Sequence, residues 1–202
     1  MYARVAAFEN RDPSLTDELI GRVREGVERG QPVPEAQGGL MLVERERGRA
    51  LGITFFRSEE QIREAADAFD RMGDDFPEQM RGRRTSVETY EVLHSEGGEG
   101  AKAARVSLLE GSSDRIDEGA RGTEEEILPQ VRQLAGFKGA LTLVDRERGR
   151  TKIITLWESD QALRSSEEQA NQLRQRAAEG AAARIVGVER YEVGVARIPA
   201  AV

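Results

Sequence analysis

The chain has 202 residues, of which 38% are hydrophobic and 33% charged, and its formal net charge is −7. The acidic balance argues against a general nucleic-acid binder or a protein of anionic membrane surfaces, while the apolar content suffices for a core. The lack of cysteine excludes disulfides and thiolate metal sites, and the single histidine, His94, excludes multi-histidine metal sites.

The N-terminus lacks the long apolar run of a signal peptide, and no window approaches the roughly 20 apolar residues of a membrane span. We therefore expect a cytoplasmic protein with no nucleic-acid and no membrane partner.

The first half of the chain predicts an alternation of strands and helices. Asp12 and Pro13 form a good helix start, and Gly48 can take the positive φ of a tight turn. The predicted elements are a strand over residues 2–8, a helix from Asp12 that ends by Gln31-Pro-Val-Pro34, hairpin strands over 38–44 and 50–56, a helix capped by Ser58, and a strand over 87–93.

The second half predicts the same order. Its first helix, over residues 112–126, is weaker because Gly119 and Gly122 interrupt it, and the capping-box spacing of Thr123 allows a new short helix to begin there. The other predicted elements are a strand over 104–109, a hairpin over 139–157, a helix capped by Ser159, and a strand over 185–195.

The two halves are a tandem repeat. An offset of 101 residues aligns Arg4 with Arg105 and Thr54 with Thr155, and 11 of the 19 positions from Leu40 to Ser58 are identical at that offset. One register held over separated segments indicates a duplication. We expect a first repeat over residues 1–95, a Gly/Glu-rich linker over 96–102, and a second repeat over 103–202.

Each repeat has the β-α-β-β-α-β order of a ferredoxin-like unit, so the predicted fold class is α+β. Such a unit carries helices on one sheet face only, and the other face must be covered. Two tandem copies predict that the two sheets pack face to face.

The segments Gly136-Phe-Lys-Gly139 and Ile154-Thr-Leu-Trp-Glu-Ser159 resemble the antibiotic-biosynthesis-monooxygenase (ABM) type of domain in the dimeric α/β-barrel superfamily. The resemblance covers both repeats but is weaker in the first, where Phe56 and Ala36 replace Trp157 and Phe137. It implies one barrel formed within the chain, and hence a monomer or weak homo-oligomer. Members of the superfamily include cofactor-independent quinone-forming monooxygenases, heme-degrading monooxygenases and proteins with no assigned activity.

The tryptophan is the first candidate for a functional residue. Ile153, Thr155 and Trp157 share one strand face, and the resemblance implies that this face lines a cavity under the helices. Trp157 could equally well serve only as core packing. The candidate ligand-binding residues are Trp157, Thr155, Arg105, Phe137, Ala170 and Tyr191, with first-repeat equivalents at Phe56, Thr54 and Arg4.

Volume differences between the repeats suggest where a cavity would lie. Phe69 and Phe76 of the first repeat correspond to Ala170 and Ala177 of the second. Either Leu134 and Phe137 refill that space, or the second repeat has the open pocket. We expect any small-molecule site to lie beside Trp157.

Heme degradation is not expected. Heme-degrading relatives have a histidine ligand on the helix that follows the tryptophan, and residues 161–179 contain none. His94 is expected to be a solvated residue near the repeat boundary. We therefore predict no metal and no cofactor.

Three function classes remain open. The first is a cofactor-independent monooxygenase acting on a small phenolic compound, as the resemblance implies; the second is a small-molecule binding or stress-related protein; the third is a structural protein with filled cavities. The volume beneath the helices would discriminate among them.

Overall fold

The computed structural model describes residues 1–30 and 33–200. The chain forms two compact units. The first unit comprises Met1–Tyr90 and Glu192–Pro199, and the second is built from Glu91–Tyr191. The units nearly follow the repeats, but each unit also includes a piece of the other repeat's last strand.

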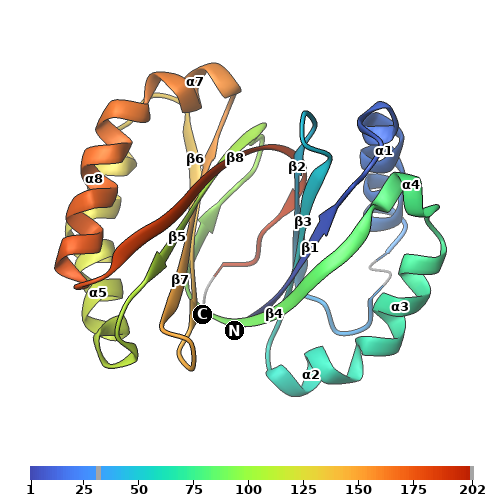
Figure 1. Ribbon diagram of the computed structural model, residues 1–202, viewed down its shortest axis with the longest axis horizontal. Coiled ribbons are helices and arrows are strands. Elements are labelled where there is room, and N and C mark those ends of the chain that lie inside the picture. The colour runs from blue at the N-terminus through green and yellow to red at the C-terminus, as the bar shows by residue number, and fades with distance from the viewer. Residues whose placement is uncertain (31–32, 201–202) are drawn as a thin grey trace. The chain divides into compact units, whose positions relative to one another are not determined.

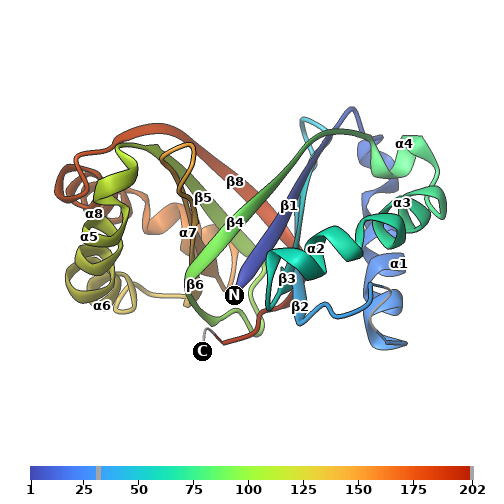
Figure 2. The same cartoon turned by 90° about the horizontal axis from the view of Figure 1, so that it is seen from below.

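In the first unit, β3 lies between β1 and β2 and pairs antiparallel with both. Figures 1 and 2 both show α1 and α3 on the same face of these strands. The elements are β1 (Tyr2–Glu9), the 3-10 helix η1 (Pro13–Leu15), α1 (Thr16–Glu28), β2 (Gly38–Glu44), β3 (Arg49–Phe56), α2 (Glu59–Glu64), α3 (Ala66–Asp74), α4 (Glu78–Arg81) and the first part of β4 (Arg83–Gly97).

The second unit repeats this arrangement, with β7 between β5 and β6. In both views α5 and α8 lie together on one face of these strands. Its elements are β5 (Ala103–Glu110), the 3-10 helix η2 (Ser113–Arg115), α5 (Ile116–Gly122), the π-helical turn η3 (Thr123–Ile127), α6 (Leu128–Val131), β6 (Phe137–Asp145), β7 (Arg150–Trp157), α7 (Asp160–Ser165), α8 (Glu167–Gly180) and the first part of β8 (Arg184–Arg197).

The long strands β4 and β8 each serve both units. The second part of β4 pairs with β6, with Ser95 opposite Leu141, and the second part of β8 pairs with β2, with Val193 opposite Leu42. The hydrogen-bonded strand order is β1-β3-β2-β8-β5-β7-β6-β4, which closes as a barrel within one chain. The predicted α+β fold of two ferredoxin-like repeats is therefore confirmed.

Local sequence signals account for the turns and helix starts. Gly48 and Gly149 have φ values of 59° and 61°, as the hairpin turns require. The hydroxyl oxygens of Ser58 and Ser159 accept hydrogen bonds from backbone N–H groups three residues later, at 3.3 and 3.1 Å, which satisfies free donors at the helix N-termini. The predicted caps are confirmed.

Three local expectations need correction. Gly122 and Thr123 both have helical dihedral angles, so Thr123 continues the helix through a π turn and starts no new one. The helix after Ser58 breaks at Ala65 into α2 and α3, and the short helix α4 follows it. The predicted end of the first helix falls partly on residues 31–32, which lie outside the described residues; α1 itself ends at Glu28.

The expected linker is also shorter than predicted. Strand β4 continues to Gly97, and Glu96 pairs opposite Ala140 while Gly97 pairs opposite Gly139. Backbone pairing with β6 therefore orders the start of the Gly/Glu-rich segment despite its flexible composition. None of the helices in residues 1–30 and 33–200 is long and apolar enough to cross a membrane.

Candidate functional site: two sheet–helix cavities

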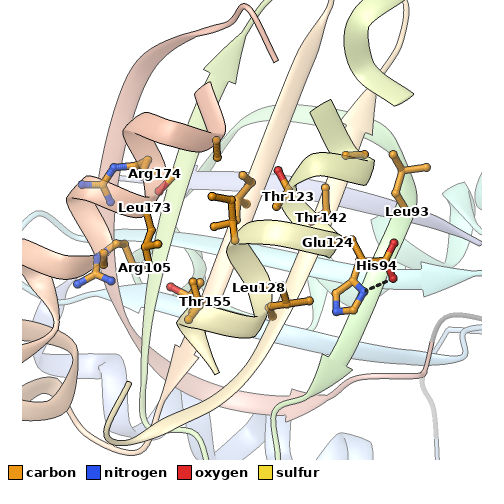
Figure 3. Close-up of a pocket in the computed structure, with 18 of the residues that line it drawn as sticks. Leu93, His94, Arg105, Thr123, Glu124, Leu128, Thr142, Thr155, Leu173 and Arg174 are labelled. Carbon is orange, nitrogen blue, oxygen red and sulfur yellow. Dashed lines mark ion pairs between the residues drawn. The ribbon is translucent and has the colours of Figure 1, made fainter. Parts of the chain in front are cut away.

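Each unit has a cavity between its sheet and its helices. The second unit's cavity has a volume of about 70 Å³, and its wall includes four of the predicted residues. In Figure 3, Arg105 and Arg174 lie at one end of this cavity, while His94 and Glu124 lie at the other. The four predicted residues in the wall are Arg105, Thr155, Trp157 and Ala170.

Trp157 closes this cavity from the β7 side and is fully buried. Its indole Nε1 donates a hydrogen bond to the Thr155 hydroxyl at 3.1 Å. The Phe137 ring meets it edge-on, with 6.1 Å between ring centroids. The indole is thus held by a polar and an aromatic contact, both of which are characteristic of a well-packed tryptophan.

Arg105 is, with Arg174, one of the buried cations of the second unit. It is 2% exposed and donates hydrogen bonds to the Leu163 carbonyl oxygen at 2.7 Å and the Ser166 hydroxyl at 3.2 Å. Its Nη2 also lies 3.0 Å from a Glu167 carboxylate oxygen. Burial lowers the pKa of Arg105, and the Glu167 charge opposes that effect. The arginine is therefore fixed by an internal counterion at the start of α8.

The Glu167 carboxylate forms ion pairs with three arginines. Its carboxylate lies 2.8 Å from Arg190 and 3.5 Å from Arg174, in addition to Arg105. Burial favours the neutral form of Glu167, but the Arg190 hydrogen bond and the Arg105 charge outweigh it, so its pKa is lowered. This carboxylate is consequently ionised at neutral pH.

The remaining second-repeat candidates lie outside the cavity wall. Phe137 packs on Trp157 and on the cluster around Ile127 and Val131. The Tyr191 hydroxyl donates a hydrogen bond to Glu189 at 2.7 Å. Neither residue is among those lining the 70 Å³ cavity, and both have packing or hydrogen-bonding partners elsewhere.

The expectation for His94 was wrong. Its side chain is only 17% exposed, because it lies within β4 rather than in a solvated linker, and it lines the second-unit cavity. Its ring nitrogens lie 3.7 Å from Glu96 and 3.8 Å from Glu124. A strand longer than expected is the physical reason for this burial.

The first unit has the larger cavity, with a volume of about 480 Å³. Two of the first-repeat candidates, Arg4 and Thr54, line it together with Phe69, whereas the third, Phe56, is buried in the adjacent core cluster. Of the two alternatives for the second repeat, the structure therefore agrees with refilling rather than with the more open pocket. Leu134 and Phe137 pack against Ile127, Val131, Leu173 and Ala177, which fills the space left by the smaller helix residues.

Arg4 is the buried cation of this larger cavity. It is 9% exposed, and its guanidinium lies over the Phe69 ring, 3.8 Å from the ring centroid. Within residues 1–30 and 33–200, no carboxylate approaches Arg4 to ion-pair distance. Burial and then repulsion from Arg84 lower the pKa of Arg4 to about 10, against a smaller opposing effect of Asp70. Arg4 therefore remains cationic at neutral pH.

Sequence reasoning missed most of this wall. Val23 and Val27, four residues apart on α1, also line the cavity. Among the described residues, the charged side chains of the wall are six arginines and one acid, Asp75. The arginines are Arg4, Arg22, Arg29, Arg81, Arg84 and Arg197.

Comparisons with known proteins agree with the fold. No family model matches the sequence. The uncharacterized protein Rv2557 of Mycobacterium tuberculosis is 27% identical over 182 residues, which is 86% of this chain and 79% of the relative.

Two solved structures are similar across nearly the whole chain. An anthrone oxidase-like protein has a TM-score of 0.63 and 18% identity, covering 98% of this chain and 92% of its own. A ferredoxin-fold protein related to antibiotic biosynthesis monooxygenases, from Listeria monocytogenes, has a TM-score of 0.52 and 10% identity, covering 94% and 93%. The chain has the fold of the ABM-like proteins, built as two ferredoxin-like repeats in one polypeptide.

Proposed function

We propose that the protein binds a small, largely apolar molecule in the sheet–helix cavity of the first unit. The cavity itself is the observation that carries this proposal. Its 480 Å³ fall within the range of about 300–1,000 Å³ that is typical of ligand pockets. The wall combines aliphatic and aromatic side chains with a few polar groups, among them Arg4 and Thr54.

The proposed site lies in the first repeat rather than beside Trp157. The second-unit cavity of 70 Å³ has room for far less, and its buried arginine already has a protein counterion. We propose that Trp157, Thr155, Arg105, Phe137, Ala170 and Tyr191 chiefly stabilise the second unit. The open volume in the first unit argues against a purely structural protein.

A cavity-filling variant tests the binding function. Gly73 lies in α3 at the cavity wall, and a Cβ atom added there meets nothing within 4 Å. Gly73→Leu would add four carbons at the cavity wall. Gly21→Leu is the matched control, because Gly21 also lies in a helix with open space around it but does not line the cavity.

The measurement is a fluorescence titration with 8-anilinonaphthalene-1-sulfonate. We expect saturable binding to the natural protein and to Gly21→Leu, and binding at least about tenfold weaker to Gly73→Leu. Equal binding to all three proteins, or no saturable binding to the natural protein, would contradict the proposal.

Oxygenation of a phenolic compound without a cofactor is the second candidate function. The observation that favours it is the pair of Arg4 and Thr54 in the wall, because a cation near a phenolate oxygen stabilises the electron-rich form that reacts with O₂. With an anthrone-type substrate, O₂ is the oxidant. One oxygen atom becomes a carbonyl at the substrate methylene, and the other leaves as water with the two hydrogens.

Oxygen uptake separates the two candidates. With anthrone as the probe, the natural protein would consume O₂ faster than buffer, and Arg4→Met would lose most of that acceleration. Consumption at the buffer rate, with probe binding retained, would eliminate the oxygenase and leave the binding function.

A further inference from the structure

We propose that the ligand of the first-unit cavity carries one carboxylate group, which the Arg4 guanidinium binds. The site would then accept aromatic or branched aliphatic monocarboxylates. This inference rests on the proposed binding function and names the class of its ligand.

The duplication supplies the main argument. Arg4 and Arg105 occupy the same position of the two repeats, and both are buried. In the second unit, Glu167 is the counterion of Arg105, at 3.0 Å. The residue at the corresponding position of the first repeat is Ala66. The first unit thus has the same buried cation without the side chain that neutralises it.

The neighbouring contacts differ in the same way. Ser166 accepts a second hydrogen bond from Arg105, and the corresponding residue of the first repeat is Ala65. No hydrogen bond of the Arg4 guanidinium to residues 1–30 or 33–200 accompanies its contact with Phe69. No nitrogen of Arg4 is among the fully buried atoms that lack a hydrogen-bond partner, so its N–H groups can be reached from the cavity. A cation in a largely apolar cavity with no protein counterion favours an anionic ligand over a neutral one.

The geometry at Arg4 suits a planar anion. The Phe69 ring lies against the guanidinium at 3.8 Å, a distance typical of a cation–π contact. This contact uses a face of the guanidinium and leaves its N–H groups, which lie in the guanidinium plane, for other partners. A carboxylate matches two of those donors in a bidentate arrangement.

The charges around Arg4 favour a monoanion. Arg84 pairs with Asp70 at 3.2 Å, and Arg22 pairs with Glu18 at 2.7 Å. Of the described arginines in the wall, Arg4 is the one that is buried. A ligand with one negative charge would complement the one buried, unpaired cation. The apolar remainder of the wall favours a ligand whose other atoms are mostly carbon.

The experiment compares a carboxylate with its neutral amide by isothermal titration calorimetry at pH 7. The probes are 2-naphthoate and 2-naphthamide, which share the same ring system. Ala66→Glu would supply the first unit with the internal counterion that the second unit has. Ala66 is exposed and begins α3, where a glutamate is well tolerated, so the variant should fold. Ala66→Gln is its uncharged control.

We expect the natural protein and Ala66→Gln to bind 2-naphthoate at least about tenfold more tightly than 2-naphthamide. Ala66→Glu would lose this preference by weakening naphthoate binding alone. Arg4→Met would also lose it, whereas Arg63→Met, which removes an exposed arginine outside the cavity wall, would keep it.

The outcomes distinguish this inference from the proposed function. Equal binding of both probes to the natural protein would overturn the carboxylate assignment and support the binding function. A naphthoate preference that survives in both Ala66→Glu and Arg4→Met would also overturn the role of Arg4. Failure of the natural protein to bind either probe would overturn the binding function for this ligand class, and the inference with it.

Discussion

Arg105 and Glu167 form an ion pair at the start of α8, with 3.0 Å between Nη2 and Oε2. Glu167→Gln would leave the buried arginine with a neutral partner. We expect the variant to lose about 1–3 kcal/mol of unfolding free energy at pH 7, since breaking a buried pair leaves one charge uncompensated. Urea denaturation of the natural protein and the variant measures this difference.

The same variant gives a pH dependence. The folded-state pKa of Glu167 lies below its ordinary value of 4.5, so its stabilisation is present above that pH and is lost as the pH falls through the folded-state pKa. The natural protein and Glu167→Gln should therefore differ at pH 7 and converge once the pH falls below the folded-state pKa of Glu167. A difference that persists unchanged at low pH would contradict this assignment.

Gly149 tests the hairpin turn of the second unit. Its φ is 61°, and a Cβ at this position would collide with the Gly111 carbonyl oxygen. We expect Gly149→Ala to cost about 2–4 kcal/mol, because it combines an unfavourable backbone conformation with a steric clash. Gly180→Ala is the control, because Gly180 ends α8 with open space around it. The midpoint of thermal unfolding of this variant should be unchanged or slightly raised.

Arg45 tests the contact between the first hairpin and β8. Its guanidinium bridges Asp17 at 2.7 Å and Glu192 at 2.6 Å, and the hydrogen bond with Glu192 is the main reason that its pKa is raised. Because these side chains are partly exposed, Arg45→Met should cost only about 1 kcal/mol at low salt. The cost should shrink in 1 M salt, which screens surface charges; urea titrations at the two salt concentrations measure it.

Trp157→Phe makes the second repeat resemble the first at the end of β7. The substitution removes the hydrogen bond to Thr155 and part of the indole's buried area. We expect a loss of about 1–3 kcal/mol in unfolding free energy and no change in probe binding to the first-unit cavity. A marked loss of probe binding, in a variant that stays folded, would instead indicate a functional role for the tryptophan.

The sequence was most informative about the architecture. The helix starts at Asp12 and Ser58 and the turn at Gly48 depend on local chemistry, and each of them appears in the structure. The length of β4 was underestimated because pairing with β6, rather than the composition of the Gly/Glu-rich segment, orders Ser95 and Glu96.

The cavities were harder to predict because packing depends on the whole set of neighbouring side chains. Ala170 and Ala177 correctly indicated that rings were missing from α8. The compensating positions of Leu134 and Phe137, and the continuous helix through Thr123 that brings Ile127 against Leu173, could not be ranked from the sequence. The charge difference between the repeats is easier to find in the sequence than the cavity volumes. Ala66 stands where the second repeat has Glu167, and this difference becomes informative once the ion pair of Glu167 with Arg105 is known.

The paths of β4 and β8 have a consequence for how the protein can be divided. Val193 and its neighbours on β8 complete the edge of β2, and Ser95 and its neighbours on β4 complete the edge of β6. A polypeptide cut between Glu99 and Lys102 would keep each repeat's own sequence but leave β2 and β6 without their partners. Each fragment would then expose an unpaired sheet edge and an unpaired half of β4 or β8. We therefore expect the separate fragments to be poorly soluble and to reassociate when they are mixed. Each repeat thus depends on the last strand of the other to complete its sheet edge.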